Sequence, residues 1–264
     1  SPERNVSLST GTMVTEALRA LGHRAGLIDL YFGLETGGAD EAFFDAPVSE
    51  AYKKISREAP DLDQVRRGRK GDSPSMFGPG VLELCRMADM VFLALHGTCG
   101  EDGRVQAAFD LMGIPYTGAG YLGSAIAMDK DLTKRMVADV VSTPGWKTVT
   151  YTAADIDRLV ETARLPLVVK PVASGSSIGV SIAYTAEELR RSLTEGLALG
   201  GRTVLEEYIR GREIQVGILE DKALPSIEII PKEGFYDYAN KYQPGAAEEI
   251  CPAPIPAEVE EKLG

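Results

Sequence analysis

The chain has 264 residues, 44% of them hydrophobic, which is enough for one large domain or two ordinary ones with a substantial core. Its 28 basic and 39 acidic side chains give a formal net charge of −11, which argues against nucleic acid or an anionic membrane as a partner of the surface as a whole. The three widely spaced cysteines predict neither a disulfide framework nor a zinc site, and no apolar run approaches the roughly 20 residues of a membrane span.

Within the first 80 residues, the pattern of apolar residues is clear up to residue 32 and weak after it. Residues 8–21 carry apolar side chains at helical spacings, and Gly22 follows as a plausible stop. Residues 25–32 (AGLIDLYF) form a short apolar run that is typical of a buried strand. Residues 33–80 are weakly patterned, and we expect them to form variable surface.

Between residues 90 and 140, patterns typical of strands alternate with patterns typical of helices. Residues 90–97 (MVFLALHG) predict a buried parallel strand that ends in a His-Gly pair. Amphipathic helices are expected over 103–114 and, as one continuous helix, over 124–140. Strands and helices in this order predict an α/β layer with parallel strands.

The character of the chain changes near Ser142. Short β-rich segments follow one another at hairpin-like separations, which predicts a second, largely antiparallel α+β domain. One helix is expected among them, over 185–199 (TAEELRRSLTEGLAL). The expected strands lie within 148–152, 165–172, 179–184, 203–209, 213–219 and 223–231.

Residues 170–181 (KPVASGSSIGVS) place a lysine before a Gly/Ser-rich turn between two expected strands. The segment is neither a Walker A loop, because GxxxxGK[ST] is absent, nor a dinucleotide fingerprint, because no helix follows. Backbone N–H groups of such a turn can surround phosphate oxygens, and Lys170 would add a positive charge. An ordinary Gly/Ser hairpin with a nearby lysine is the alternative interpretation.

Three further segments contain residues suited to ligand binding. LEEYIRGREI (205–214) brings carboxylates to a strand end, where they suit an adenine amine and ribose hydroxyls. HGTCGEDG (96–103) places His96 and Glu101 in a glycine-rich loop after a strand, where ligands of α/β proteins bind. FYDYANKY (235–242) surrounds Lys241 with aromatic rings. A capping acid, a structural histidine and a loop anchored by its rings are the respective alternatives.

Taken together, these segments resemble the D-alanine–D-alanine ligases of the ATP-grasp superfamily. The resemblance runs in order through SPERNVSLSTG, HGTCGEDGRVQAAFDLMGIPYTGAG, AMDKDLTK, VVKPVASGSSIGVS, LEEYIRGREI, FYDYANKY and ICPAPI, over nearly the whole chain. It implies an ATP-grasp fold of α/β and α+β class, with a parallel N-terminal α/β domain before a largely antiparallel ATP-binding domain. The domains implied are an N-terminal substrate domain at 1–121, a central ATP-binding domain at 122–210 and the start of a C-terminal domain at 211–264.

The resemblance also implies a reaction. ATP phosphorylates the carboxylate of one D-alanine, and the amine of a second D-alanine attacks the acyl phosphate, which releases ADP, phosphate and the dipeptide used for peptidoglycan. Positive side chains and backbone amides would neutralise the phosphates that gather at such a site.

The family's functional residues can be carried over position by position. Lys130 and Lys170 would contact the ATP phosphates, with Ser176 and Ser177 in the loop that closes over them. Lys241 would meet the transferred phosphoryl group. Glu3 would bind the ammonium of the first D-alanine and form a hydrogen-bonded triad with Ser176 and Tyr242. Val6 and His96 would border that substrate, and the adenine and ribose would be surrounded by Glu206, Glu207, Ile209 and Glu213.

The sequence departs from the family pattern at both ends. The strands that carry the magnesium ligands have no match after ICPAPIPAEVEEKLG, so we assign no metal ligands and expect those for Mg²⁺ or Mn²⁺ in a C-terminal portion beyond residue 264. Without divalent cations to bridge the phosphates, the chain as written is expected to be inactive or nearly so. A truncated nucleotide-binding pseudoenzyme is therefore one alternative, and an ATP-grasp ligase for another D-amino or D-hydroxy acid is a second.

The expected partners are D-alanine and ATP, with no nucleic acid and no membrane, and the family resemblance implies a homodimer. Residues 1–11 have no basic-then-apolar signal sequence, so we expect a cytoplasmic protein. FYDYANKY lacks the histidine found in relatives that make D-alanyl-D-lactate, which favours the dipeptide as product.

Overall fold

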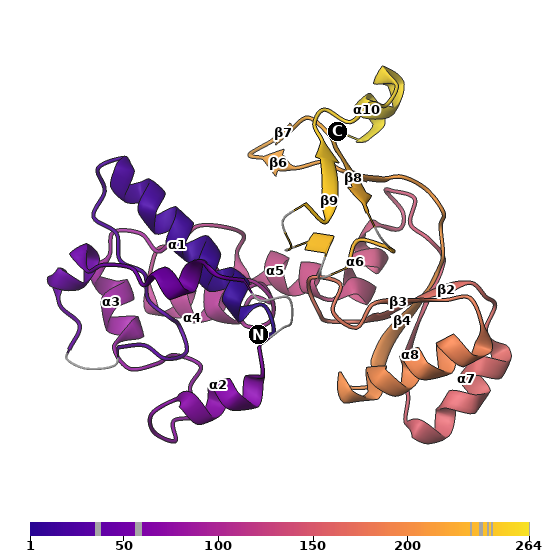
Figure 1. The fold of residues 1–264 in the computed structure, drawn as a ribbon, viewed down its shortest axis with the longest axis horizontal. Coiled ribbons are helices and arrows are strands. Elements are labelled where there is room, and N and C mark those ends of the chain that lie inside the picture. The colour runs from indigo at the N-terminus through magenta and orange to yellow at the C-terminus, as the bar shows by residue number, and fades with distance from the viewer. Residues whose placement is uncertain are drawn as a thin grey trace. The chain divides into compact units, whose positions relative to one another are not determined.

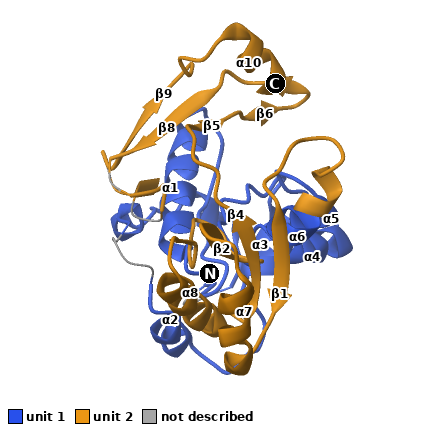
Figure 2. Ribbon diagram, turned by 90° about the vertical axis from the view of Figure 1, so that its right-hand side faces the viewer, with its two compact units in different colours: residues 1–133 blue, residues 134–264 orange. Residues whose placement is uncertain are grey.

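A computed structural model describes residues 1–34, 38–55, 60–232, 234–237, 240–241, 243 and 245–263. The chain divides into two compact units, residues 1–133 and residues 134–264, drawn in different colours in Figure 2. The finer division into three domains that the family resemblance implies stays a prediction.

The first unit is mainly helical, and its core is formed by two helices whose apolar residues recur at helical spacing. Val81 and Cys85 of α3, and Val105 and Phe109 of α4, are each four residues apart and all four are buried, together with Ile114. Burial raises the pKa of the Cys85 thiol to about 11, so this cysteine stays protonated and behaves as a core residue. The helices of the unit are α1 (Arg4–Ala20), η1 (Glu41–Asp45), η2 (Glu50–Lys53), α2 (Leu62–Gly68), α3 (Val81–Met87), α4 (Arg104–Met112), α5 (Tyr121–Met128) and the start of α6 (Lys130–Val137).

The strands expected at 25–32 and 90–97 are not formed as regular strands. Among the described residues, the expected parallel layer is represented by a parallel bridge between Val91 and Tyr116. In the earlier segment, the Asp29 carboxylate accepts hydrogen bonds from the backbone N–H groups of Tyr31 and Phe32, and the Asp29 carbonyl accepts from Gly33. These local bonds turn the chain and use backbone groups that a strand ladder would need.

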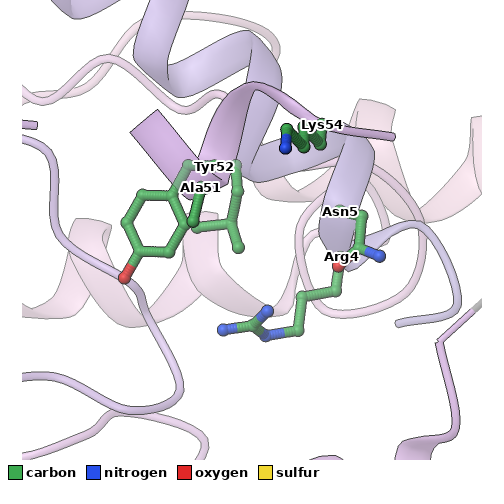
Figure 3. A pocket seen from close by; sticks show the side chains of 6 residues that line it. Arg4, Asn5, Ala51, Tyr52 and Lys54 are labelled. Carbon is green, nitrogen blue, oxygen red and sulfur yellow. The ribbon is translucent and has the colours of Figure 1, made fainter. Parts of the chain in front are cut away.

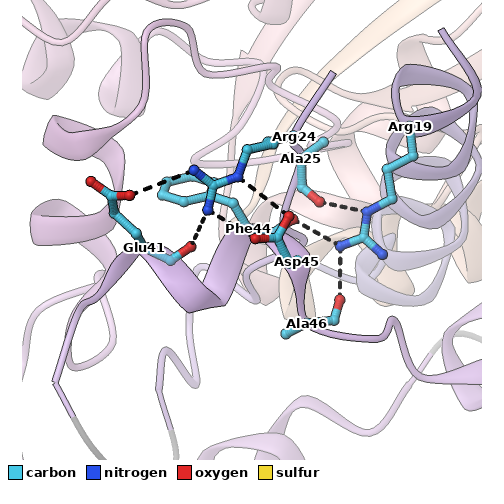
Figure 4. A network of polar contacts seen from close by, with 7 residues as sticks. All are labelled: Arg19, Arg24, Ala25, Glu41, Phe44, Asp45 and Ala46. Carbon is cyan, nitrogen blue, oxygen red and sulfur yellow. Dashed lines mark hydrogen bonds and ion pairs between the residues drawn. The ribbon is translucent and has the colours of Figure 1, made fainter. Parts of the chain in front are cut away.

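Residues 33–80 contain more regular structure than the sequence indicates, because η1, η2 and α2 all lie there. Two arginines at and beyond the end of α1 hold η1 in place (Figure 4). Arg24 donates to the Glu41 carbonyl at 2.9 Å and to the Asp45 carboxylate at 2.8 Å, and Arg19 donates to the Ala46 carbonyl at 2.7 Å. The Arg24 guanidinium also keeps the pKa of Asp45 below its usual value.

The single helix expected over 124–140 is interrupted at Asp129, which separates α5 from α6. Asp129 has an extended backbone with ψ of 105°, and its carboxylate accepts a hydrogen bond from the N–H of Leu132 at 2.9 Å. A short acidic side chain that bonds to the backbone in this way starts a new helix. The amphipathic pattern continues across the break, which is why periodicity alone did not reveal it.

The second unit contains a four-stranded antiparallel sheet with strand order β1-β4-β2-β3. Helices α7 and α8 lie together on one face of it (Figure 1) and bury their apolar residues against the sheet. The α8 helix starts at a capping box in which Thr185 and Glu188 satisfy each other's backbone N–H groups. The elements are β1 (Trp146–Thr150), η3 (Ala153–Asp155), α7 (Ile156–Thr162), β2 (Leu167–Pro171), β3 (Ser181–Ala183), α8 (Ala186–Ala198) and β4 (Arg202–Glu207).

The rest of this unit forms two smaller sheets, β5-β8-β9 and β6-β7, whose strands are all antiparallel. Each of the six β-rich segments expected after Ser142 overlaps at least one of the observed strands, and α8 is the helix expected among them. No helix in the described part of the chain is long and apolar enough to cross a membrane. The remaining elements are β5 (Glu213–Gln215), β6 (Ile218–Leu219), β7 (Lys222–Ala223), β8 (Ile227–Pro231), β9 (Ala247–Ile250) and α10 (Ala257–Leu263).

Leu189 of α8 tests the contribution of this core, because its side chain is fully buried against the sheet. We expect Leu189→Ala to lower the free energy of unfolding of the second unit by about 2–5 kcal/mol, from lost burial plus the cavity left behind. Leu219→Ala is the control, since Leu219 is 64% exposed. Trp146 is the single tryptophan of the chain, so urea unfolding followed by its fluorescence reports on this unit. Equal effects of the two substitutions would contradict the assignment of the core.

Candidate functional site

Alternation along the strands divides the side chains of the four-stranded sheet between its two faces. Leu205 pairs in register with Val169, and both lie on the face covered by α7 and α8. Glu206 pairs in register with Trp146 and therefore points to the opposite face. Lys170 is one residue beyond Val169, so it shares the face of Glu206. The pleat alone thus brings a carboxylate, a cation and an indole to one surface.

The Glu206 carboxylate lies between two ammonium groups. Its Oε1 atom is 2.6 Å from Lys170 Nζ, and its Oε2 atom is 2.9 Å from Lys134 Nζ on α6. The Glu206 side chain is only 8% exposed, so its charge depends on these partners rather than on water. Lys170 and Glu206, both predicted from the sequence, are therefore in direct contact, and Lys134 is a third member that the sequence analysis missed.

Glu207 alternates to the other face of β4 and is exposed, so its carboxylate does not join this cluster. Its backbone N–H donates to the Gly145 carbonyl at 2.8 Å, next to Trp146. Ile209 follows the strand and is 57% exposed. The roles of Glu207 and Ile209 around a nucleotide stay predictions.

The Gly/Ser-rich segment after β2 has an unusual backbone. Ser176 and Ser177 have φ values of 49° and 58°, a left-handed conformation that residues other than glycine rarely adopt. Hydrogen bonds from Ile178 N–H to the Gly175 carbonyl and from Val180 N–H to the Ser177 carbonyl close two tight turns. Strained, non-glycine turns of this kind are concentrated at ligand clamps.

This loop touches the aromatic segment that contains Lys241. The Ser177 hydroxyl donates to the Tyr236 carbonyl at 2.8 Å, and Lys241 Nζ lies 5.2 Å from the centre of the Tyr236 ring. Burial and the carboxylates of Glu249 and Glu213 raise the pKa of the Tyr236 phenol. The structure thus brings the predicted residues Ser177, Lys241 and Glu213 to a common neighbour. Tyr242, also predicted, lies outside the described residues.

In the first unit, the His96–Gly97 pair lies beside α1, with Gly97 next to Glu3 and His96 next to Ser7 and Thr10. Glu3 is 3% exposed, and its carboxylate lies so close to Gly97 that a Cβ atom there would be 2.4 Å from Oε2. His96 donates its backbone N–H to the Ser7 hydroxyl at 2.9 Å, and its Nε2 atom is 3.1 Å from Thr10 Oγ1. The loop is closed by Glu101, whose carboxylate accepts from the Gly97 N–H at 2.6 Å.

Two other predicted residues of this unit lie on its helices. Val6 is a buried residue of α1, 4% exposed, one turn after Glu3. Lys130 is the first residue of α6, and Lys134 follows it by four positions, one helical turn further on. That spacing is the sequence signal that could have indicated Lys134.

Two cavities of the described structure lie away from the predicted site residues. One cavity of about 150 Å³ lies between α1 and η2 and is lined by Arg4, Asn5, Leu8, Ala51, Tyr52 and Lys54 (Figure 3). Another, of about 310 Å³, is lined by Val216, Ala223, Leu224, Pro225 and Glu260. None of the predicted site residues lines either cavity. Within the described ranges, no group of three or more His, Cys, Asp or Glu side chains could hold a metal ion.

Comparison with known proteins decides the family. The family model for the D-alanine–D-alanine ligase N-terminus matches residues 1–119, and the model for the C-terminus matches residues 139–264. The chain belongs to the D-alanine–D-alanine ligase family. The resemblance stated from the sequence is confirmed.

Similar proteins include both curated relatives and solved structures. The D-alanine–D-alanine ligase of Pediococcus pentosaceus is 38% identical over 266 residues, which cover 100% of this chain and 74% of the relative. The ligase of Bacillus anthracis complexed with ATP is 34% identical, with a TM-score of 0.56, over 69% of this chain and 58% of that one. The VanG D-Ala:D-Ser ligase of Enterococcus faecalis is 33% identical, with a TM-score of 0.56, over 67% of this chain and 53% of that one. These neighbours confirm the ATP-grasp fold class.

Gly97 tests the position of the Glu3 carboxylate. In Gly97→Ala, the new methyl group would lie within 2.4 Å of Glu3 Oε2 and 2.3 Å of Ser1 Oγ, so these flexible side-chain ends must move. Gly113→Ala is the matched control, because Gly113 also has positive φ, 65° against 75°, with nothing within 4 Å of the added atom.

We expect both variants to lose about 1–2 kcal/mol of stability from the left-handed backbone. Only Gly97→Ala is expected to alter the environment of Glu3. Chemical denaturation measures the first effect, and NMR titration of carboxylates labelled at glutamate measures the second. An unshifted Glu3 signal in Gly97→Ala would show that its carboxylate does not lie against Gly97.

Proposed function

We propose that this protein joins two D-alanine molecules into D-alanyl-D-alanine at the expense of ATP, through an acyl phosphate. Family membership is the observation that carries the proposal. The product serves the synthesis of peptidoglycan precursors and thereby cell-wall biogenesis and cell shape. A cytoplasmic homodimer is the form in which we expect it to act.

The chemistry of the proposed step requires cations at the site of phosphoryl transfer. A carboxylate is a poor electrophile until phosphorylation gives it a good leaving group, and phosphorylation requires that several negative charges be neutralised together. Lys170 and Lys241 are the cations we assign to the polyphosphate and to the transferred phosphoryl group, with Lys130 as a third. Ser176 and Ser177 belong to the loop that would cover them.

The nucleotide base and ribose are assigned to the acidic residues of the same unit. Glu206 and Glu213 offer carboxylate acceptors for the adenine amine and the ribose hydroxyls, with Glu207 and Ile209 beside them. The ATP complex of the Bacillus anthracis ligase supports a nucleotide as the ligand. Among the described residues, no cluster of acidic side chains could hold a magnesium ion.

The first D-alanine is assigned to the start of α1. Glu3 is a buried carboxylate that can pair with a substrate ammonium, and we assign Val6 and His96 to the border of that substrate. We propose that Glu3 acts with Ser176 and Tyr242 in a hydrogen-bonded chain that orients the substrate. Ser176 is also part of the loop that we assign to the phosphates, so the two assignments share this residue.

The reaction itself is tested with protein purified from its complete reading frame. We expect phosphate release from ATP, in the presence of magnesium, with D-alanine and none above background with L-alanine. With D-lactate or D-serine added, D-alanyl-D-alanine should remain the main product at neutral pH. Predominant depsipeptide or D-alanyl-D-serine by mass spectrometry would assign the second substrate differently, and the VanG neighbour makes D-serine the rival to include.

The assigned substrate residues are tested one at a time. Glu3→Gln, Ser176→Ala and Tyr242→Phe should each lower turnover by about 100-fold or more, because each removes one member of a proton-transfer and orienting chain. ATP binding, measured by calorimetry, should be retained. Glu161→Gln and Ser142→Ala, at exposed positions, are the matched controls. Unchanged turnover in all three variants would refute the assigned roles.

A further inference from the structure

The two lysines that flank Glu206 differ in how fully their ammonium groups are used. A lysine ammonium has three N–H donors. Lys134 Nζ lies within hydrogen-bond distance of Glu206 Oε2, Thr143 Oγ1 and the Pro144 carbonyl, at 2.9, 2.5 and 3.2 Å. It also lies 5.0 Å from the centre of the Trp146 ring, where the face of an indole attracts a cation. Every donor of Lys134 therefore has a partner.

Lys170 is held much less firmly. Among the residues that the structure describes, its ammonium has one partner, Glu206 Oε1 at 2.6 Å. Its side chain is 26% exposed, against 12% for Lys134. Lys170 can therefore offer further donors to a ligand, whereas Lys134 cannot.

We propose that Lys134 is a positioning residue: it is the permanent counter-ion of Glu206, and this leaves Lys170 free to bind the polyphosphate of the nucleotide. The inference rests on the proposed function, because it assigns the ligand of Lys170 as ATP. Lys134 itself acts through Glu206 and does not touch the ligand.

The charges of Lys134, Lys170 and Glu206 do not cancel. Two ammonium groups and one carboxylate carry a net charge of +1, so the cluster has one cation in excess of what Glu206 needs. When Lys170 turns to an incoming phosphate, Glu206 keeps its ion pair with Lys134 and is never left as a buried, unpaired charge. If Lys134 is removed, Lys170 becomes the only counter-ion of Glu206. When Lys170 then binds a ligand, the buried Glu206 carboxylate is left unpaired, at the full free-energy cost of an unpaired buried charge.

Calorimetric titration of the full chain with ATP, in excess magnesium, tests this inference. We expect Lys134→Met to weaken ATP binding by about tenfold or more, and Lys134→Arg, which keeps the charge, to stay within about threefold of wild type. Lys147→Met is the matched control, because Lys147 is an exposed lysine on the opposite face of β1 and should bind ATP as the wild type does.

The same substitution made in Glu206→Gln protein distinguishes charge compensation by Lys134 from packing by its side chain. In Glu206→Gln, the neutral amide needs no counter-ion, so adding Lys134→Met should weaken ATP binding by less than about threefold further. A role confined to packing against Trp146 would give the same loss in both backgrounds. The emission of Trp146 without ligand shows whether each variant is folded at this site, and Lys134→Gln replaces Lys134→Met if the latter does not fold.

The outcomes are distinct. Wild-type protein that does not bind ATP would overturn the proposed function, and the inference with it. Wild-type protein that binds ATP, with Lys134→Met within twofold of it or with equal losses in both backgrounds, would overturn the inference alone.

Discussion

The ion pair between a buried carboxylate and two lysines is the interaction on which the candidate site of the second unit depends. Glu206 reaches that surface because a strand alternates its side chains, and its neighbours on the other face are committed to the core under α7 and α8. A buried carboxylate tolerates this position only with cations beside it. The cations that Glu206 requires therefore place positive charge on the surface where we propose that a polyanion binds.

The sequence predicts the second unit better than the first, and for a physical reason. The elements of the second unit are marked by residues within them: β-branched and other apolar residues at 167–169 and 203–205, and the capping box that starts α8. In the first unit, the expected parallel strands were apolar runs without such additional signals. There, one local hydrogen-bonding residue, Asp29, was enough to turn an apolar run away from a strand, and Asp129 divided a periodic helix in the same way.

The candidate site was also predicted from the sequence only in part. Lys170 and Glu206 were identified from motifs, and their contact follows from strand register once the pairing of β2 with β4 is known. Lys134 was missed because its importance comes from a tertiary contact between a helix and a strand 72 positions later, which its spacing from Lys130 does not show by itself. Glu206 and Glu207 looked equivalent in the sequence, yet the pleat sends them to opposite faces.

The left-handed serines of the Gly/Ser loop have a consequence for how that loop is held in place. Glycine would adopt φ values of 49° and 58° without penalty, whereas serine retains them against a backbone preference of about 1–2 kcal/mol per residue. The hydroxyl bond from Ser177 to the Tyr236 carbonyl offsets about 0.5–1.5 kcal/mol of that preference. A contact with a segment 59 positions later therefore helps to hold Ser177 in a conformation that its own backbone disfavours.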